Sequence, residues 1–173
     1  MRKFAASFLT MVILAGPGIV TGCGSAAGKK QEASAPDKAT VEAPDQQGTT
    51  ALMRAIEDRN DQEARRLIDM GANINAKAQS GVTPLMKAAG VGDKGLVGLL
   101  IEKGADVNAR TPGNYTVLMQ AALVGQTEIV KILLDHGADA TVKDSSGRSA
   151  SDYAREKEHQ DIVDLLKEKG AKS

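Results

Sequence analysis

The stretch of sequence that decides the fold runs from Asn114 to Asp144 and reads NYTVLMQAALVGQTEIVKILLDHGADATVKD. It holds two short apolar segments separated by a turn at Gly125, and Gly137 follows the second segment. Steps of 33 residues along the chain find the same pattern in three more copies. Gly-Ala pairs begin at residues 71, 104, 137 and 170, and the hydroxyl residues Thr50, Thr83, Thr116 and Ser149 keep the same spacing. A fixed period of this length indicates a stack of similar structural units.

Each copy predicts a helix, a short turn, a second helix and a loop. Threonine and serine are good N-cap residues, so the first helix should begin just after the hydroxyl residue, with Pro84 in the first turn of the second copy. The glycine of each Gly-Ala pair suits the left-handed residue that ends a helix. Each loop also has Gly or Asn114 at one position, and asparagine tolerates positive φ better than other non-glycine residues. We therefore predict an all-α solenoid of four helix-turn-helix units with short finger loops, at about residues 48–80, 81–113, 114–146 and 147–173.

The repeat resembles the ankyrin repeat, whose period and Thr-Pro-Leu-His-x-Ala signature are matched most nearly by Thr83-Pro84-Leu85-Met86-Lys87-Ala88. The resemblance covers residues 48–171. In the family the histidine of the signature helps to tie neighbouring loops by hydrogen bonds. Here its place is taken by Met53, Met86, Met119 and Asp152. The resemblance therefore implies that this network is lost and that a gap-filling side chain takes the space.

Differences between the copies predict where the stack begins and ends. Positions such as Leu100 are apolar in every copy and should form a common core. The position of Leu96 is apolar except in the first copy, which has Glu63, so it should face the preceding unit. The position of Ile56 is apolar except in the last copy, which has Arg155, so it should face the following unit. Terminal units of a solenoid need polar outer faces, and we expect the array to be complete at four units.

The first 23 residues have the layout of a bacterial lipoprotein signal. A short basic start precedes a mostly apolar run from Phe4 to Val20, as in a secretory signal peptide. The run ends in Val20-Thr21-Gly22-Cys23, which resembles the lipobox. In lipobox proteins the cysteine becomes the first mature residue and carries lipid, so the resemblance implies a signal peptide over 1–22 and lipidation of Cys23. The alternatives are a cleaved signal with a spare thiol nearby, or an uncleaved anchor.

The segment after Cys23 is predicted to be a disordered tether. Residues 24–47 are mostly small, charged or amide residues, and Val41 is the only sizeable apolar side chain. Such a segment cannot bury enough apolar surface to offset the entropy of ordering. The chain thus divides into 1–22, 23–47 and an ankyrin domain over 48–173. The expected location is the cell envelope: the outer membrane or periplasm of a Gram-negative host, or the outer face of the plasma membrane of a Gram-positive one.

Composition and motifs argue against several functions. Lys plus Arg and Asp plus Glu both number 22, so no excess positive charge points to nucleic acid. The single cysteine excludes an internal disulfide and a cysteine-based metal cluster. His136 and His159 are the only histidines, and we expect both to have structural roles at helix ends. Because no triad, phosphate loop or metal motif is present, we expect no catalytic residue, no metal and no cofactor.

The ankyrin resemblance implies a non-enzymatic protein–protein interaction module that binds an unidentified protein on its concave surface of first helices and finger loops. We expect a monomer, anchored to a membrane through lipid. The middle of the surface is apolar and its ends are charged, as in an interface with a dry centre and a polar rim, although these side chains could instead shield the first helices from the fingers. The alternatives are an envelope enzyme or metal-handling accessory protein with an unrecognised site, and a passive spacer. The candidate partner-binding residues are Lys87, Val91, Arg110, Tyr115, Gln120, Leu123, Val124 and Tyr153.

Overall fold

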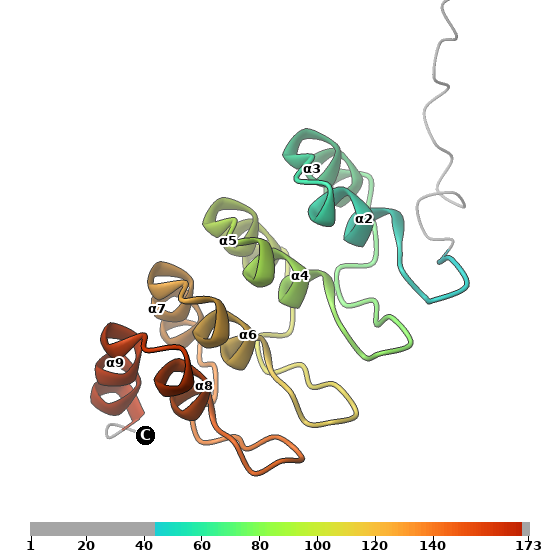
Figure 1. The fold of residues 1–173 in the computed structure, drawn as a ribbon. Coiled ribbons are helices and arrows are strands. Elements are labelled where there is room, and N and C mark those ends of the chain that lie inside the picture. The colour runs from blue at the N-terminus through green and yellow to red at the C-terminus, as the bar shows by residue number, and fades with distance from the viewer. Residues whose placement is uncertain (1–43, 171–173) are drawn as a thin grey trace, which may run out of the picture. The chain divides into compact units, whose positions relative to one another are not determined.

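The structure, a computed structural model, describes residues 44–170, which form eight helices and no strand. The helices come in pairs, and Figure 1 shows the pairs stacked in chain order with the finger loops projecting on one side. The predicted all-α solenoid of four units is therefore confirmed. The pairs are α2 (Ala51–Glu57) with α3 (Asp61–Asp69), α4 (Pro84–Val91) with α5 (Lys94–Glu102), α6 (Val117–Val124) with α7 (Thr127–Asp135), and α8 (Ala150–Glu156) with α9 (Gln160–Gly170).

The first helix of each unit begins at a hydroxyl cap, as predicted. The side chains of Thr50, Thr83 and Thr116 each accept a hydrogen bond from the backbone N–H three residues later, at 3.3 Å. Ser149 makes the same bond to Asp152, whose carboxylate in turn accepts from the Ser149 backbone N–H at 2.9 Å. These caps satisfy helix N–H groups that have no partner within the helix, and each typically stabilises by about 1 kcal/mol.

Left-handed residues occur at most of the positions that the sequence predicted, although Gly170 is the last residue of α9 instead, and they also occur at the helix-helix turn of all four units. The glycines that follow α3, α5 and α7 have positive φ, and so does Asn114, at 58°. Arg59 and Glu158, at the helix-helix turns of the two end units, also have positive φ, which was not predicted. In the two interior units glycine stands at this turn, and a side chain of the next unit lies over it: a Cβ on Gly125 would lie 2.5 Å from the imidazole ring of His159, and one on Gly92 would meet the Gln126 side-chain amide.

The apolar core runs through the whole stack. The common leucines Leu67, Leu100, Leu133 and Leu166 are at most 4% exposed. Both predicted interface stripes are confirmed, because their interior members are buried while Glu63 is partly exposed and Arg155 is exposed. The first stripe has Leu96, Ile129 and Ile162, and the second has Ile56, Ala89 and Ala122. The end units therefore close the stack with polar surface.

Neighbouring loops are tied by a column of asparagines. The Asn75 side chain donates to the Gly104 carbonyl at 3.0 Å and accepts from the Asp106 N–H at 2.9 Å. Asn108 makes the equivalent two bonds to the next loop, both at 2.9 Å. The methionines at the histidine position are buried, as expected: Met53, Met86 and Met119 are at most 4% exposed. The asparagine column therefore links the loops in a stack that lacks the signature histidine.

The first finger begins before residue 48. The backbone N–H of Asp45 donates to the Thr49 carbonyl at 3.0 Å, as the same positions do in the later fingers, and Gln79 N–H donates to the Gln47 carbonyl at 2.9 Å. The first unit thus includes at least residues 45–47, which the sequence assigned to the tether. Cys23, the predicted signal peptide and the rest of the tether lie outside the described residues. Among the described helices, none has the length and apolarity needed to cross a membrane.

Candidate functional site

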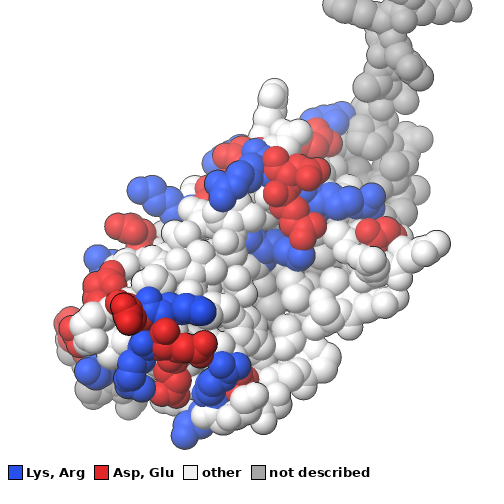
Figure 2. Space-filling view, viewed as in Figure 1, with Lys and Arg blue, Asp and Glu red and all other residues white. Residues whose placement is uncertain are grey.

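The candidate site is the surface formed by α2, α4, α6 and α8 together with the finger loops, which we call the finger face. Figure 2 shows charged side chains gathered over the first and last units and a mostly uncharged surface between them. At the first unit Glu57 and Asp58 are exposed, and at the last unit Glu156 and Lys157 are. The finger face thus has a mostly uncharged central region, apart from Lys87 and Arg110, between charged ends.

Three of the candidate residues form the apolar part of this central region. Val91 and Leu123 are partly buried and pack against the core. Val124 is 40% exposed, the one large hydrophobic side chain among residues 44–170 that is this accessible. Leu123 is therefore partly covered by the core, whereas Val124 is the more accessible of the two.

A hollow of about 310 Å³ lies between α4 and the start of the next unit. It exists because Gly90 has no side chain where the other units have Glu57, Leu123 and Glu156. Lys87 forms an ion pair with Glu57 at its edge. The Tyr115 hydroxyl donates to the Gln120 side-chain oxygen at 3.2 Å. The residues that line the hollow are Glu57, Val82, Met86, Lys87, Gly90, Val91, Tyr115 and Gln120, so four of the candidates meet here.

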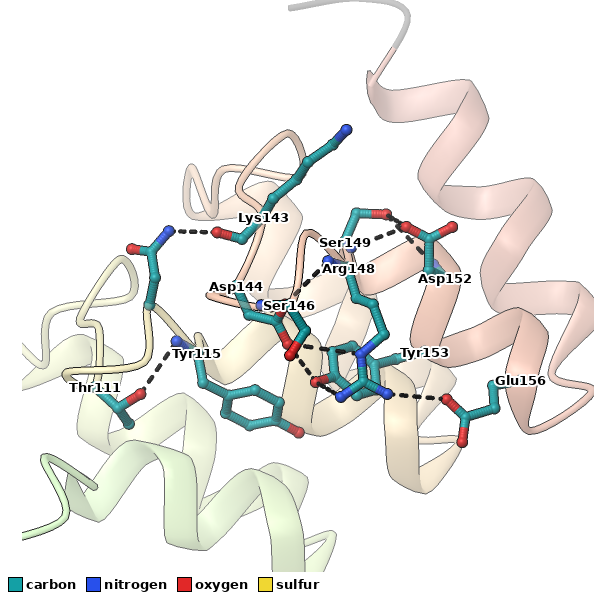
Figure 3. A network of polar contacts seen from close by, with 11 residues as sticks. Thr111, Tyr115, Lys143, Asp144, Ser146, Arg148, Ser149, Asp152, Tyr153 and Glu156 are labelled. Carbon is teal, nitrogen blue, oxygen red and sulfur yellow. Dashed lines mark hydrogen bonds and ion pairs between the residues drawn. The ribbon is translucent and has the colours of Figure 1, made fainter.

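Tyr153 differs from the other candidates because it is only 5% exposed. Its hydroxyl donates to the Asp144 carboxylate at 2.5 Å and accepts from the Arg148 guanidinium at 2.7 Å. The guanidinium also lies 4.3 Å from the centre of the Tyr153 ring. Figure 3 shows this network, with Tyr115 beside it. Tyr153 therefore belongs to the interior, and its prediction as a partner-binding residue is wrong.

The role of Tyr153 is to position Tyr115. The two rings meet edge to face, with centroids 5.4 Å apart and planes at 88°, a favourable arrangement for aromatic pairs. The Tyr115 backbone N–H also donates to the Thr111 hydroxyl at 3.1 Å. Sequence reasoning missed the Asp144–Arg148–Tyr153 network, since the Arg and the Tyr occur at these positions in one copy only, although Asp45 repeats the position of Asp144. The repeat period gave no signal for it.

The electrostatics of this network favour binding over acid–base chemistry. Burial raises the pKa of Tyr115 to about 12, and the neighbouring Tyr153 adds to the rise. Burial, followed by the bond to Asp144, also raises the pKa of Tyr153. The hydrogen bond from Tyr153 is the largest cause that lowers the pKa of Asp144. At neutral pH the tyrosines are thus protonated donors and the carboxylate is ionised and engaged, so none is poised to exchange a proton.

Arg110, the remaining candidate, is exposed on its finger. Its guanidinium donates to the Asn114 side-chain oxygen at 3.2 Å and lies 3.9 Å from the Asp139 carboxylate. His136 and His159 stand apart from the finger-face hollow. His136 lies 2.8 Å from the Ile132 carbonyl at the end of α7, and His159 packs over the preceding turn. Within the part of the chain that the structure describes, no group of three or more His, Cys, Asp and Glu residues could hold a metal ion.

Comparison with known protein families agrees with this helical repeat architecture. A model of ankyrin repeats in three copies matches residues 30–111, and a model of ankyrin repeats in many copies matches residues 100–154. The two matches together cover well over half of the chain, and the protein belongs to the ankyrin-repeat family. Such repeats mediate binding to protein partners. No curated protein matches the chain.

Proposed function

We propose that this protein is a non-enzymatic lipoprotein of the bacterial cell envelope that binds a protein partner on its finger face. The observation that carries the proposal is the central apolar region with Val124 exposed, flanked by charged ends. Protein interfaces combine a largely desolvated centre with a polar, accessible rim. Val124 supplies a centre residue that the fold itself leaves uncovered, and the charged ends supply the rim.

The anchor is the second part of the proposal. Val20-Thr21-Gly22-Cys23 supports lipidation at Cys23, and stable membrane attachment takes about two lipid signals, which a fully modified lipobox cysteine supplies. Cleavage after residue 22 removes two basic residues and no acid, so the mature chain has a net charge of about −2. The residues between Cys23 and the first finger then hold the stack near the membrane surface.

The partner-binding part can be tested by crosslinking the chain in its own envelope and comparing Val124→Glu with the wild type. Because Val124 is 40% exposed, a glutamate there should change the free energy of unfolding by only about 0.5 kcal/mol. A partner that docks on this residue should be lost from the crosslinked products. The matched control is Gln62→Glu, which adds the same charge at an exposed position of α3. Capture that survives Val124→Glu, or that is lost in the control, would place the interface elsewhere.

The anchor can be tested by labelling cells with a radioactive or clickable fatty acid. The wild-type protein should take up label and fractionate with membranes, and Cys23→Ser should take up none. A wild-type chain without label, or a labelled Cys23→Ser chain, would exclude lipidation at this cysteine. This test is independent of the finger face, so either half of the proposal can fail alone.

A further inference from the structure

A second hollow, which we call the entry hollow, lies in the first unit. Its volume is about 520 Å³. Gly71, Asn73 and Ala76 line it from the loop that follows α3, and Pro44 and Thr50 line it from either side of the first finger. Since Pro44 is the first residue that the structure describes, the preceding chain enters the fold at the edge of this hollow.

The entry hollow offers an occupant a cation and a hydrogen-bond donor. Lys77 lines it, and no ion pair joins this lysine to a carboxylate between residues 44 and 170. The backbone N–H of Asn73 has no hydrogen-bond acceptor within the described part of the chain. The described lining residues include no Asp or Glu. A carboxylate is therefore the chemical complement of this hollow.

An asparagine side chain occupies the equivalent place in the next unit. Asn75 accepts a hydrogen bond from the Asp106 N–H at 2.9 Å and donates to the Gly104 carbonyl at 3.0 Å. One period of 33 residues earlier, Asn73 corresponds to Asp106 and Gly71 corresponds to Gly104. Both of these earlier residues line the entry hollow. The side chain that fits the entry hollow is therefore that of the residue one period before Asn75.

That residue is Glu42, and its neighbours also follow the repeat. Residues 72–76 read Ala-Asn-Ile-Asn-Ala, and residues 39–43 read Ala-Thr-Val-Glu-Ala. The first apolar position of this pattern is buried in the described loops, and the second packs against the core. The first position holds Ala72, Ala105 and Ala138, and the second holds Ile74, Val107 and Ala140. Ala39 and Val41 thus have residue types that suit both positions.

The repeat register extends to the chain around Pro44. The Asp45 carboxylate accepts hydrogen bonds from the backbone N–H groups two and four residues later, both at 2.8 Å. Asp144, three periods further on, makes the same two bonds at 2.8 and 2.9 Å. The match to three ankyrin repeats also begins at residue 30, before the described residues. The segment before Pro44 is therefore in register with the later loops of the stack.

We propose that residues 39–43 dock on the loop that follows α3, with the Glu42 carboxylate in the entry hollow. There the carboxylate accepts a hydrogen bond from the Asn73 N–H and pairs with Lys77. Val41 packs against the core, as Ile74 does one unit later. The occupant is this segment rather than a second copy or another protein, because its covalent link to Pro44 gives it a high effective concentration at the hollow. The inference goes beyond partner binding, since it concerns how the stack begins and how it is attached.

Docking of this segment shortens the predicted tether. With lipid on Cys23, residues 24–38 would span at most about 50 Å when fully extended, compared with about 70 Å for residues 24–43. The stack would therefore stay closer to the membrane surface than the sequence alone predicts.

Hydrogen exchange of single backbone amides, followed by NMR in the purified full chain, tests this inference. The Asn73 amide should exchange at least about tenfold more slowly than an unstructured amide, because a hydrogen bond holds it. The amides of Asp106 and Asp139 are internal references, since they donate to the side chains of Asn75 and Asn108.

Variants at Glu42 identify the acceptor. Glu42→Ala should return the Asn73 amide to the unstructured rate and leave the two reference amides unchanged. Glu42→Asn should keep the Asn73 amide slow, because asparagine accepts this bond in the next two units. The matched control is Glu32→Ala, which removes the same side chain earlier in the sequence and should change none of the three rates.

Three results would overturn the inference. The first is exchange of the Asn73 amide at the unstructured rate in the wild type, a result that needs no variant to fold. The second is slow exchange that persists in Glu42→Ala. The third is slow exchange that disappears on dilution, which would assign the entry hollow to a second copy of the chain. None of these measurements involves the finger face, so the proposed partner binding stands or falls separately.

Discussion

Shortening Leu133 to alanine should destabilise the stack more than the same change at the end of the chain. Leu133 lies in α7, is 0% exposed and has a helix pair on either side of its own. Leu→Ala removes the equivalent of about three methylene groups, or roughly 2.4 kcal/mol at about 0.8 kcal/mol each. A residual cavity of about 50 Å³ would add roughly 1 kcal/mol. The expected loss is therefore about 3–4 kcal/mol, within the usual range of about 2–5 kcal/mol for such changes.

The matched variant is Leu166→Ala, the same change in the last unit. Leu166 is 4% exposed and lies in α9, beyond which the described chain has no further helix pair. Because an end unit can relax into a cavity or open locally, the loss there should be only about 1–2 kcal/mol.

Equilibrium unfolding in urea, followed by far-ultraviolet circular dichroism, measures both losses. Leu133→Ala should also lower Tm by about 10–15 °C, since 1 kcal/mol shifts a domain of this size by a few degrees. Equal losses of unfolding free energy at the two positions would refute the view that neighbours on both sides stabilise an interior unit. A loss below about 1 kcal/mol at Leu133 would show that this side chain is not tightly packed in the core.

Three further predictions follow from individual contacts. Gly125→Ala should lower Tm more than Gly137→Ala. Both changes place alanine at a positive φ, but only at Gly125 does a histidine ring occupy the place of the new Cβ. Equal shifts in Tm would mean that the ring moves freely. Tyr153→Phe should cost about 1–2 kcal/mol, since two charged neighbours lose their hydrogen-bond partner, and an unchanged urea midpoint would show that water replaces it. Tyr115 ionises near pH 10.0 in the unfolded chain but has a pKa of about 12 in the folded protein. The free energy of unfolding should therefore be unaffected by this group below pH 10.0 and should decrease as the pH rises from 10.0 toward about 12. Tyrosinate absorbance should therefore appear together with unfolding, and its appearance in a fully folded protein would contradict this.

The sequence by itself determined the architecture of the stack. Each unit contacts mainly its neighbours, so the 33-residue period, the hydroxyl caps and the apolar positions report local and nearest-unit packing directly. Glu63 and Arg155 stand at positions that are apolar in the other copies, and they indicated the two ends of the stack, because an apolar residue is needed only where a neighbouring unit covers it. The sequence also placed Val91, Leu123 and Val124 together on one face, since equivalent positions in a solenoid lie side by side.

Only the tertiary structure decided which of these residues remain accessible. Leu123 and Val124 are adjacent in the sequence, yet one packs against the core and the other is 40% exposed. Tyr153 resembled a surface residue in the sequence but is buried beneath an arginine and beside Tyr115. The hollow at Gly90 arises where α4 meets the finger of the next unit. The exposure of a residue depends on which side chains cover it in the folded chain. Many of these covering side chains belong to other repeats, so the sequence of one repeat does not determine the exposure of its residues.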